Sequence, residues 1–143
     1  RRSQKGGFDA VLMTQGMEAI MANMDAIETN ENASDKDEDL LTTMEVVYEY
    51  YLRGFSFLPI DVYKSHATKF LIIDGKILPP FVAISGLGEN AAWDLMRGRE
   101  GKTFLSIEEV AAACPKVSKT HIQMLKDAGA FGSLPDTSQI SLF

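Results

Sequence analysis

The chain has 143 residues, of which 45% are hydrophobic and 24% charged, a composition typical of a soluble globular protein with one core or two small ones. Its single cysteine, Cys114, excludes a disulfide framework and a cysteine-rich zinc site, and it favours a reducing, cytoplasmic setting. The net charge is −6, but the acids are unevenly placed: nine acids and one base lie between residues 25 and 49, and nine acids and ten bases lie from residue 50 onward. Only the second part is expected to face phosphate groups.

The first third of the chain predicts two helices joined by a polar loop. Apolar residues recur at helical spacing, which predicts a helix with one face turned toward the core; methionines can also form an adaptable binding surface, but we prefer packing. The stripe consists of Met13, Met17, Ile20, Met21, Met24 and Ile27. Ser34 or Asp35 is expected to be the N-cap of a second helix from about residue 37 to 52. We interpret the acids beside that cap as a solvated helix start rather than a metal site.

Patterning then changes to that of strands. The stretches FSFLPIDVY and ATKFLII are short and rich in aromatic and β-branched residues. Asp74-Gly75, between FLII and KIL, is typical of a two-residue hairpin turn, and Pro79-Pro80 is expected to end strand pairing. Helical patterning returns in FVAI, ENAAWDLMRGRE, SIEEVAAAC and SKTHIQMLKDAGA. The predicted fold class is therefore mainly α with a small β-hairpin.

The turn SGLG, residues 85–88, joins the apolar piece FVAI to the helix ENAAWDLMRGRE. Glycine allows positive φ and close approach of a ligand to the backbone, and the helix start adds free N–H groups. These features predict an anion site made of backbone, with arginines at the far end of the helix reaching flanking phosphates. The alternative is a purely structural turn. The DNA-binding residues predicted here are Ser85, Gly86, Leu87, Gly88, Asn90, Arg97 and Arg99.

The string apolar-x-Gly-apolar-Gly, followed by two alanines and a helix ending in arginine, resembles the helix-hairpin-helix motif of non-sequence-specific DNA binding. The resemblance implies that the amides of Gly86 and Gly88 hold a phosphate. It also implies a monovalent cation site at the carbonyls of Val82, Ile84 and Leu87. A second, degenerate unit in SIEEVAAACPKVSKTHIQMLKDAGAF would place Lys116 and Lys119 at its turn, although plain core helices explain that stretch equally well.

A longer series of motifs carries a wider resemblance. PIDVYKSHATKFLIIDGKILPPF, AISGLGENAAWDLMRGRE, KTFLSIEEV, VSKTHIQMLKDAGAFGSLPD and QISLF follow one another in this order. The series resembles the C-terminal end of the PolC-type α subunit of bacterial DNA polymerase III, over nearly the whole chain. Departures are modest, since Ile140 stands where Leu is commoner and Ser85 where Pro often precedes the glycines.

This resemblance implies a division of the chain. Residues 8–56 would be the helical end of a fingers region, residues 57–130 a β-hairpin with a duplex-binding helix-hairpin-helix region, and residues 131–143 a flexible tail. Residues 1–7 fit less well and are expected to be disordered or foreign to the natural chain. The acidic residues that hold Mg²⁺ for polymerisation would lie upstream. This chain alone is therefore expected to have no catalytic residue and no cofactor, although its parent would be a DNA-directed DNA polymerase.

The stretch QISLF at residues 139–143 carries the other implied function, docking on the sliding clamp. Gln139 would offer its amide to a polar edge, Ile140, Leu142 and Phe143 would fill an apolar cleft, and Ser141 would be a solvent-facing spacer. A fold in which Leu142 and Phe143 pack back on their own domain is the alternative. The expected partners are duplex DNA, the sliding clamp and the rest of the polymerase chain.

A different function remains open on the residues alone. In that alternative the chain is a non-enzymatic scaffold or adaptor, its hairpins are structural connectors, and its acidic first third binds a basic protein.

Overall fold

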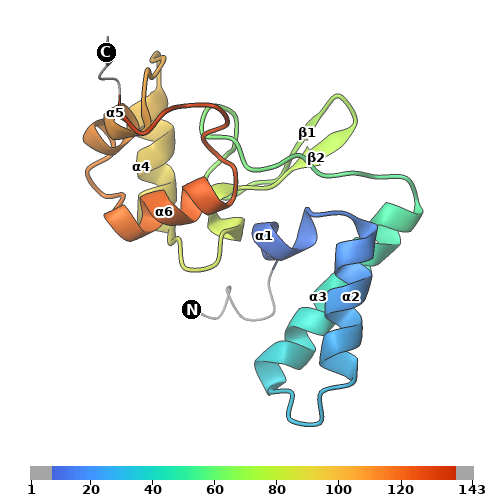
Figure 1. Cartoon of the computed structure of the whole chain (residues 1–143). Coiled ribbons are helices and arrows are strands. Elements are labelled where there is room, and N and C mark those ends of the chain that lie inside the picture. Colours follow the sequence, from blue (N-terminus) through green and yellow to red (C-terminus); the bar gives the residue numbers. More distant parts are fainter. Residues whose placement is uncertain (1–7, 138–143) are drawn as a thin grey trace, which may run out of the picture.

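The computed structural model describes residues 8–137 and confirms the predicted fold class, a mainly helical chain with one small β-hairpin (Figure 1). In chain order the elements are α1 (Ala10–Met13), α2 (Met17–Glu28), α3 (Asp35–Leu52), β1 (Leu71–Ile73), β2 (Lys76–Leu78), the 3-10 helix η2 (Phe81–Ala83), α4 (Glu89–Arg99), α5 (Ile107–Ala113) and α6 (Lys119–Asp127). Across residues 8–137, none of these helices has the length and apolar character that a membrane crossing requires.

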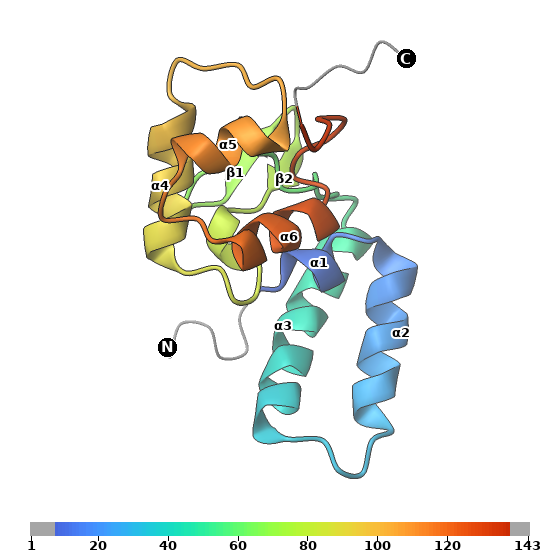
Figure 2. The ribbon, with the colours of Figure 1, turned by 60° about the vertical axis from the view of Figure 1, so that its left-hand side comes forward.

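Helices α2 and α3 form an antiparallel pair that extends away from the rest of the molecule (Figure 2). The prediction of Ser34 as N-cap is confirmed, because its Oγ accepts a hydrogen bond from the Asp37 N–H at 3.1 Å and the Asp37 carboxylate accepts one from the Ser34 N–H at 3.2 Å. The acids of this helix start therefore cap α3. The pair has its own small core, which contains Met13, Ile20, Met44 and Val47.

The methionine stripe predicted before this loop is only partly buried. The chain leaves the helix after Met13 and starts α2 beyond Gly16, which has a φ of +108°. Because the break changes the direction of the chain, the six apolar residues do not share one continuous helix face. Met17 and Met21 are 36% and 47% exposed, so the prediction that they pack in the core is wrong.

The β-hairpin forms at the predicted turn. Strands β1 and β2 pair antiparallel, and Asp74 and Gly75 between them both have positive φ, 51° and 78°, as expected for a type I′ turn. The stretch FSFLPIDVY was predicted as a strand, but it makes only an isolated parallel bridge between Phe57 and Ile77. Pro59 explains the difference, because it has no N–H with which to extend the ladder.

A larger core consists of Ala10 and buried residues between 60 and 131, and it lies under η2, α4, α5 and α6. Phe81, Leu87, Leu95 and Leu125 are among its most buried side chains, each at most 1% exposed. Phe8 packs against both this core and the core of the α2–α3 pair. The boundary at residue 56 between two predicted domains stays a prediction.

The described part of the predicted flexible tail lies against the larger core. The carbonyl oxygens of Pro135 and Asp136 accept hydrogen bonds from the N–H groups of Ile107 and Glu108, at 2.9 and 3.1 Å. The Asp136 carboxylate also lies 3.0 Å from the Lys126 ammonium group. These contacts cap the start of α5, so the chain is fixed to the domain as far as Asp136. The QISLF stretch lies outside the described residues.

Candidate functional site

We call residues 84–88 the first turn. It connects η2 to α4, so the apolar piece FVAI forms a 3-10 turn where the sequence predicted an α-helix. The Leu87 N–H donates to the Ile84 carbonyl at 3.0 Å, and the Leu87 side chain is 1% exposed, which anchors the turn in the core. Gly86, by contrast, is exposed and has a φ of +92°. The buried leucine thus presents the two glycines to solvent.

The start of α4 differs from most other helix starts in the structure. Gly88 is its N-cap and has no side chain to cap it, whereas serine hydroxyls cap α3, α5 and α6. Within residues 8–137, the N–H groups of Gly86, Gly88 and the first α4 residues 89–91 have no hydrogen-bond acceptor. A Cβ added at Gly88 would meet no atom within 4 Å, so the space beside Gly88 is open, whereas a Cβ added at Gly86 would lie 2.9 Å from Met124 Cε. The first turn therefore has the geometry expected of a backbone anion site.

We call residues 114–118 the second turn. It has the skeleton of the first turn thirty residues later: the Val117 N–H donates to the Cys114 carbonyl at 3.0 Å, as Leu87 does to Ile84. The hydrogen bond before it also repeats, from Cys114 to Ala111 at 3.3 Å. Val117 is buried like its counterpart. This repetition favours a second hairpin unit over two unrelated core helices.

The donors of the second turn are occupied. The Lys116 N–H donates to Asp94 Oδ2 at 2.8 Å and the Ser118 N–H donates to His121 Nδ1 at 3.3 Å, while the Ser118 hydroxyl oxygen accepts from the His121 N–H of α6 at 3.2 Å. Asp94 lies on α4, is 4% exposed, and also accepts from Arg97 Nε at 2.9 Å. Burial favours a higher pKa of the Asp94 carboxyl, but the Lys116 and Arg97 hydrogen bonds and the Arg97 charge outweigh it and hold that pKa below its ordinary value.

The predicted arginines are held by internal contacts. Arg97 pairs with Asp94 and also donates from Nη2 to the Ala113 carbonyl at 3.3 Å, although 61% of its side chain is exposed. Arg99 donates from Nη1 to the Val62 carbonyl at 3.0 Å and lies over the Phe81 ring. Burial lowers the Arg99 pKa. The structure therefore does not bring the arginines to the first turn as free side chains, and their contact with DNA stays a prediction.

The other predicted residues lie at the two turns. Ser85 and Asn90 are exposed at the first, and Lys116 and Lys119 are exposed at the second. Among the carbonyls predicted to hold a cation, that of Ile84 already accepts the Leu87 N–H. The cation site stays a prediction. Cys114 is buried, and burial, followed by the nearby Asp94 charge, raises the pKa of its thiol.

Two residues of α4, Trp93 and Asp94, were not singled out from the sequence. Trp93 is 46% exposed and its ring meets His66 edge-on, with centroids 5.2 Å apart. The sequence indicated that Trp93 is exposed, because the alanines before it and the leucine after it have the spacing of core-facing positions. Asp94 is the second, and its neighbour Arg97 three residues later was the available sign of an ion pair.

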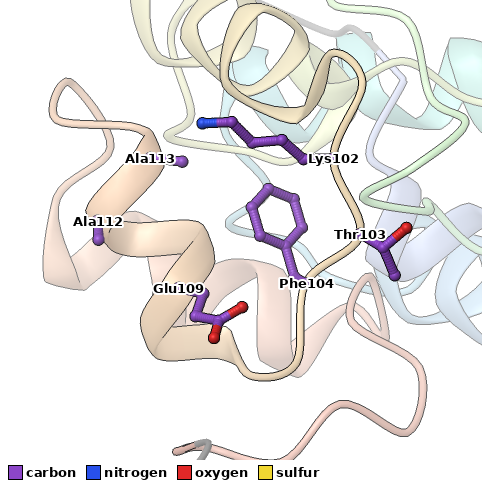
Figure 3. A pocket seen from close by; sticks show the side chains of 6 residues that line it. All are labelled: Lys102, Thr103, Phe104, Glu109, Ala112 and Ala113. Carbon is purple, nitrogen blue, oxygen red and sulfur yellow. The ribbon is translucent and has the colours of Figure 1, made fainter.

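An open hollow of about 460 Å³ lies between the linker after α4 and α5 (Figure 3). Lys102, Thr103, Phe104, Glu109, Ala112 and Ala113 line it. The Glu109 carboxylate accepts a hydrogen bond from the Leu105 N–H at 2.8 Å. Among the described residues, no three His, Cys, Asp or Glu side chains are grouped to hold a metal.

Comparison with known proteins adds two findings. A family profile described as "Helix-hairpin-helix motif" matches residues 54–140. Proteins named DNA polymerase III PolC-type are similar to 95% of this chain: 42% identical over 137 residues in Bacillus cereus, 42% over 138 in Thermotoga petrophila and 42% over 139 in Streptococcus pneumoniae. The chain spans only 9 to 10% of the length of these relatives, so it matches a segment of the polymerase.

Proposed function

We propose that this chain, which belongs to the helix-hairpin-helix family, binds duplex DNA without regard to base sequence through the backbone of its first turn. The observation that supports this most directly is the set of N–H groups without an acceptor at Gly86, Gly88 and the start of α4, with open space beside Gly88. A phosphate oxygen accepts from such donors and is favoured by the positive end of the helix dipole. Contacts of this kind position a duplex and carry no sequence information.

The distribution of charge supports the same placement. The acidic residues 25–49 belong largely to the α2–α3 pair, which projects away from the hairpins (Figure 2). The unit with the turns carries nearly balanced charge and exposes Lys116 and Lys119. A duplex at the first turn would therefore avoid most of the repulsion that a net charge of −6 suggests.

Similarity to PolC-type DNA polymerase III supports a place for this activity in DNA replication. In this proposal the chain is a non-catalytic part of a replicative polymerase in the cytoplasm, and the Mg²⁺-binding acids belong to other parts of that polymerase. Its contribution to the reaction is to hold the duplex that polymerisation produces.

Docking on the sliding clamp through QISLF is a separate part of the proposal and rests on the residue types. An amide followed by Ile, Leu and Phe suits a cleft with one polar edge. Even a weak peptide contact raises the effective concentration of the polymerase at the primer end.

A salt titration tests duplex binding. The 143-residue chain is mixed with two labelled 20-base-pair duplexes of different sequence, and anisotropy is followed from low to physiological salt. Equal affinities that fall steeply with salt are expected. Gly88→Val fills the open space beside residue 88 and should weaken binding about tenfold, the equivalent of one charge-assisted hydrogen bond.

Thr42→Val is the matched control, because it places the same side chain on an exposed position of α3. Its affinity should equal that of the unmodified chain. Absence of duplex binding at low salt would refute the proposal and leave the scaffold alternative. For the clamp, equal affinities of the full chain and a chain ending at Ser138 would refute docking.

A further inference from the structure

Each of the two turns is contacted by the helix that follows the other turn. Asp94 on α4 lies against residue 116 of the second turn, with 2.8 Å between its Oδ2 and the backbone nitrogen of Lys116. Met124 on α6, thirty residues after Asp94, lies against residue 86 of the first turn, where its Cε is 2.9 Å from the position of an added Gly86 Cβ. Equivalent positions on equivalent helices therefore cover equivalent turns.

The two covering side chains differ in chemistry. Met124 is apolar, so it packs on Gly86 and leaves the backbone donors of the first turn unused. Asp94 places a carboxylate on the second turn, and carboxylate oxygens accept from backbone N–H groups as phosphate oxygens do. The second turn therefore already holds an anion that belongs to the chain.

We infer that Asp94 occupies the phosphate position of the second turn, so that a duplex is held through the backbone of the first turn alone. This inference rests on the proposed function. A phosphate cannot readily replace the carboxylate, because Asp94 is 4% exposed and its other oxygen is bound by Arg97. The Ser118 N–H, a further donor of the same turn, is bound to His121 Nδ1 at 3.3 Å. Lys116 and Lys119 are left to act only through their charged side chains.

Asp94 thereby gains a positioning role. It joins α4, which begins at the first turn, to the second turn, and Arg97 adds a link to the Ala113 carbonyl. The second hairpin fixes the orientation of the helix whose free end meets the phosphate. One hairpin binds and the other holds it in place.

Nuclear magnetic resonance of the unmodified 143-residue chain tests the inference without a variant. Backbone amide shifts are followed while an unlabelled 20-base-pair duplex is added at low salt. The amides of Gly86, Gly88 and Asn90 are expected to shift strongly, and those of Lys116 and Ser118 to stay near their starting positions. Equal shifts at both turns would overturn the inference and leave duplex binding intact. Absence of any shift, with no change in anisotropy, would overturn both.

A pair of variants at equivalent positions gives a second readout. Gly88→Val and Ser118→Val place the same side chain on the first and second turns, thirty residues apart. Duplex affinity should fall about tenfold for the first and less than twofold for the second. Circular dichroism of Ser118→Val checks that loss of its helix cap leaves the fold in place. Equal losses in two folded variants would overturn the inference.

Discussion

The first and second turns share a skeleton and differ in what their backbone donors bind. Both have a buried apolar residue, Leu87 or Val117, that donates to the carbonyl three residues earlier. In the first turn the N–H groups of Gly86 and Gly88 have no acceptor, whereas in the second the equivalent N–H groups of Lys116 and Ser118 donate to Asp94 and His121. Two turns with the same backbone path therefore differ in which N–H groups stay available to a ligand. The side chain placed over each turn makes this difference.

The largest expected effect comes from opening the second turn. Asp94→Ala removes the acceptor of the Lys116 N–H and the partner of Arg97 in a buried place. We expect the free energy of unfolding to fall by about 2 to 3 kcal/mol, because the partly buried Lys116 N–H loses its acceptor and Arg97 loses its ion-pair partner. Urea denaturation followed by circular dichroism measures it. Asp127→Ala, an exposed carboxylate on α6, is the control and should cost far less.

A smaller loss of stability is expected from adding a methyl group where α4 packs on the second turn. A Cβ at Gly98 would lie 2.5 Å from Cys114 Sγ and 2.8 Å from the Ala113 carbonyl oxygen. Gly98→Ala should therefore lower the free energy of unfolding by about 1 to 2 kcal/mol despite the better helix propensity of alanine. Gly88→Ala, on the same helix with open space around it, is the matched control. Equal stabilities would show that the contact between α4 and the second turn is loose.

Acid should weaken the contact between Asp94 and the second turn. Because the folded-state pKa of Asp94 lies below its ordinary value of 3.8, the ionised carboxylate stabilises the fold above pH 3.8, and this stabilisation is lost as the pH falls through the lower folded value. The stability difference between the unmodified chain and Asp94→Asn should be constant from about pH 7 to 5 and shrink below 3.8. A difference that shrinks already between pH 7 and 5 would contradict the assignment.

The smallest effect should come from making the first turn more like the second. Gly88→Ser gives α4 the hydroxyl cap that Ser118 gives α6. Thermal stability should rise by a few tenths of a kcal/mol, since serine is only slightly better than glycine as an N-cap. Duplex affinity should fall at the same time, because the hydroxyl oxygen takes a donor from the phosphate. A rise in both quantities would show that the uncapped start of α4 has no role in binding.

Much of this arrangement could be predicted from local sequence. Asp74-Gly75 predicted the β-hairpin, and Ser34 predicted the cap of α3. The residues around Gly86 and Gly88 predicted the first turn. The break at Gly16 was missed because helical spacing continues across it. Asp94 was missed for another reason. Its partner Lys116 is distant in sequence and contributes its backbone N–H, a group that does not depend on the residue type and so leaves no sequence pattern. Contacts to the main chain are largely invisible to sequence patterns.

The carbonyls of Pro135 and Asp136, bound at the start of α5, limit how far the QISLF stretch can reach from the domain. Three peptide steps separate Asp136 from Gln139, which at full extension span about 11 Å. If QISLF binds the clamp, the tether between the clamp and the domain is therefore short. The cleft that receives Gln139 would then lie close to the start of α5, and the orientation of the clamp would be coupled to that of a duplex bound at the first turn.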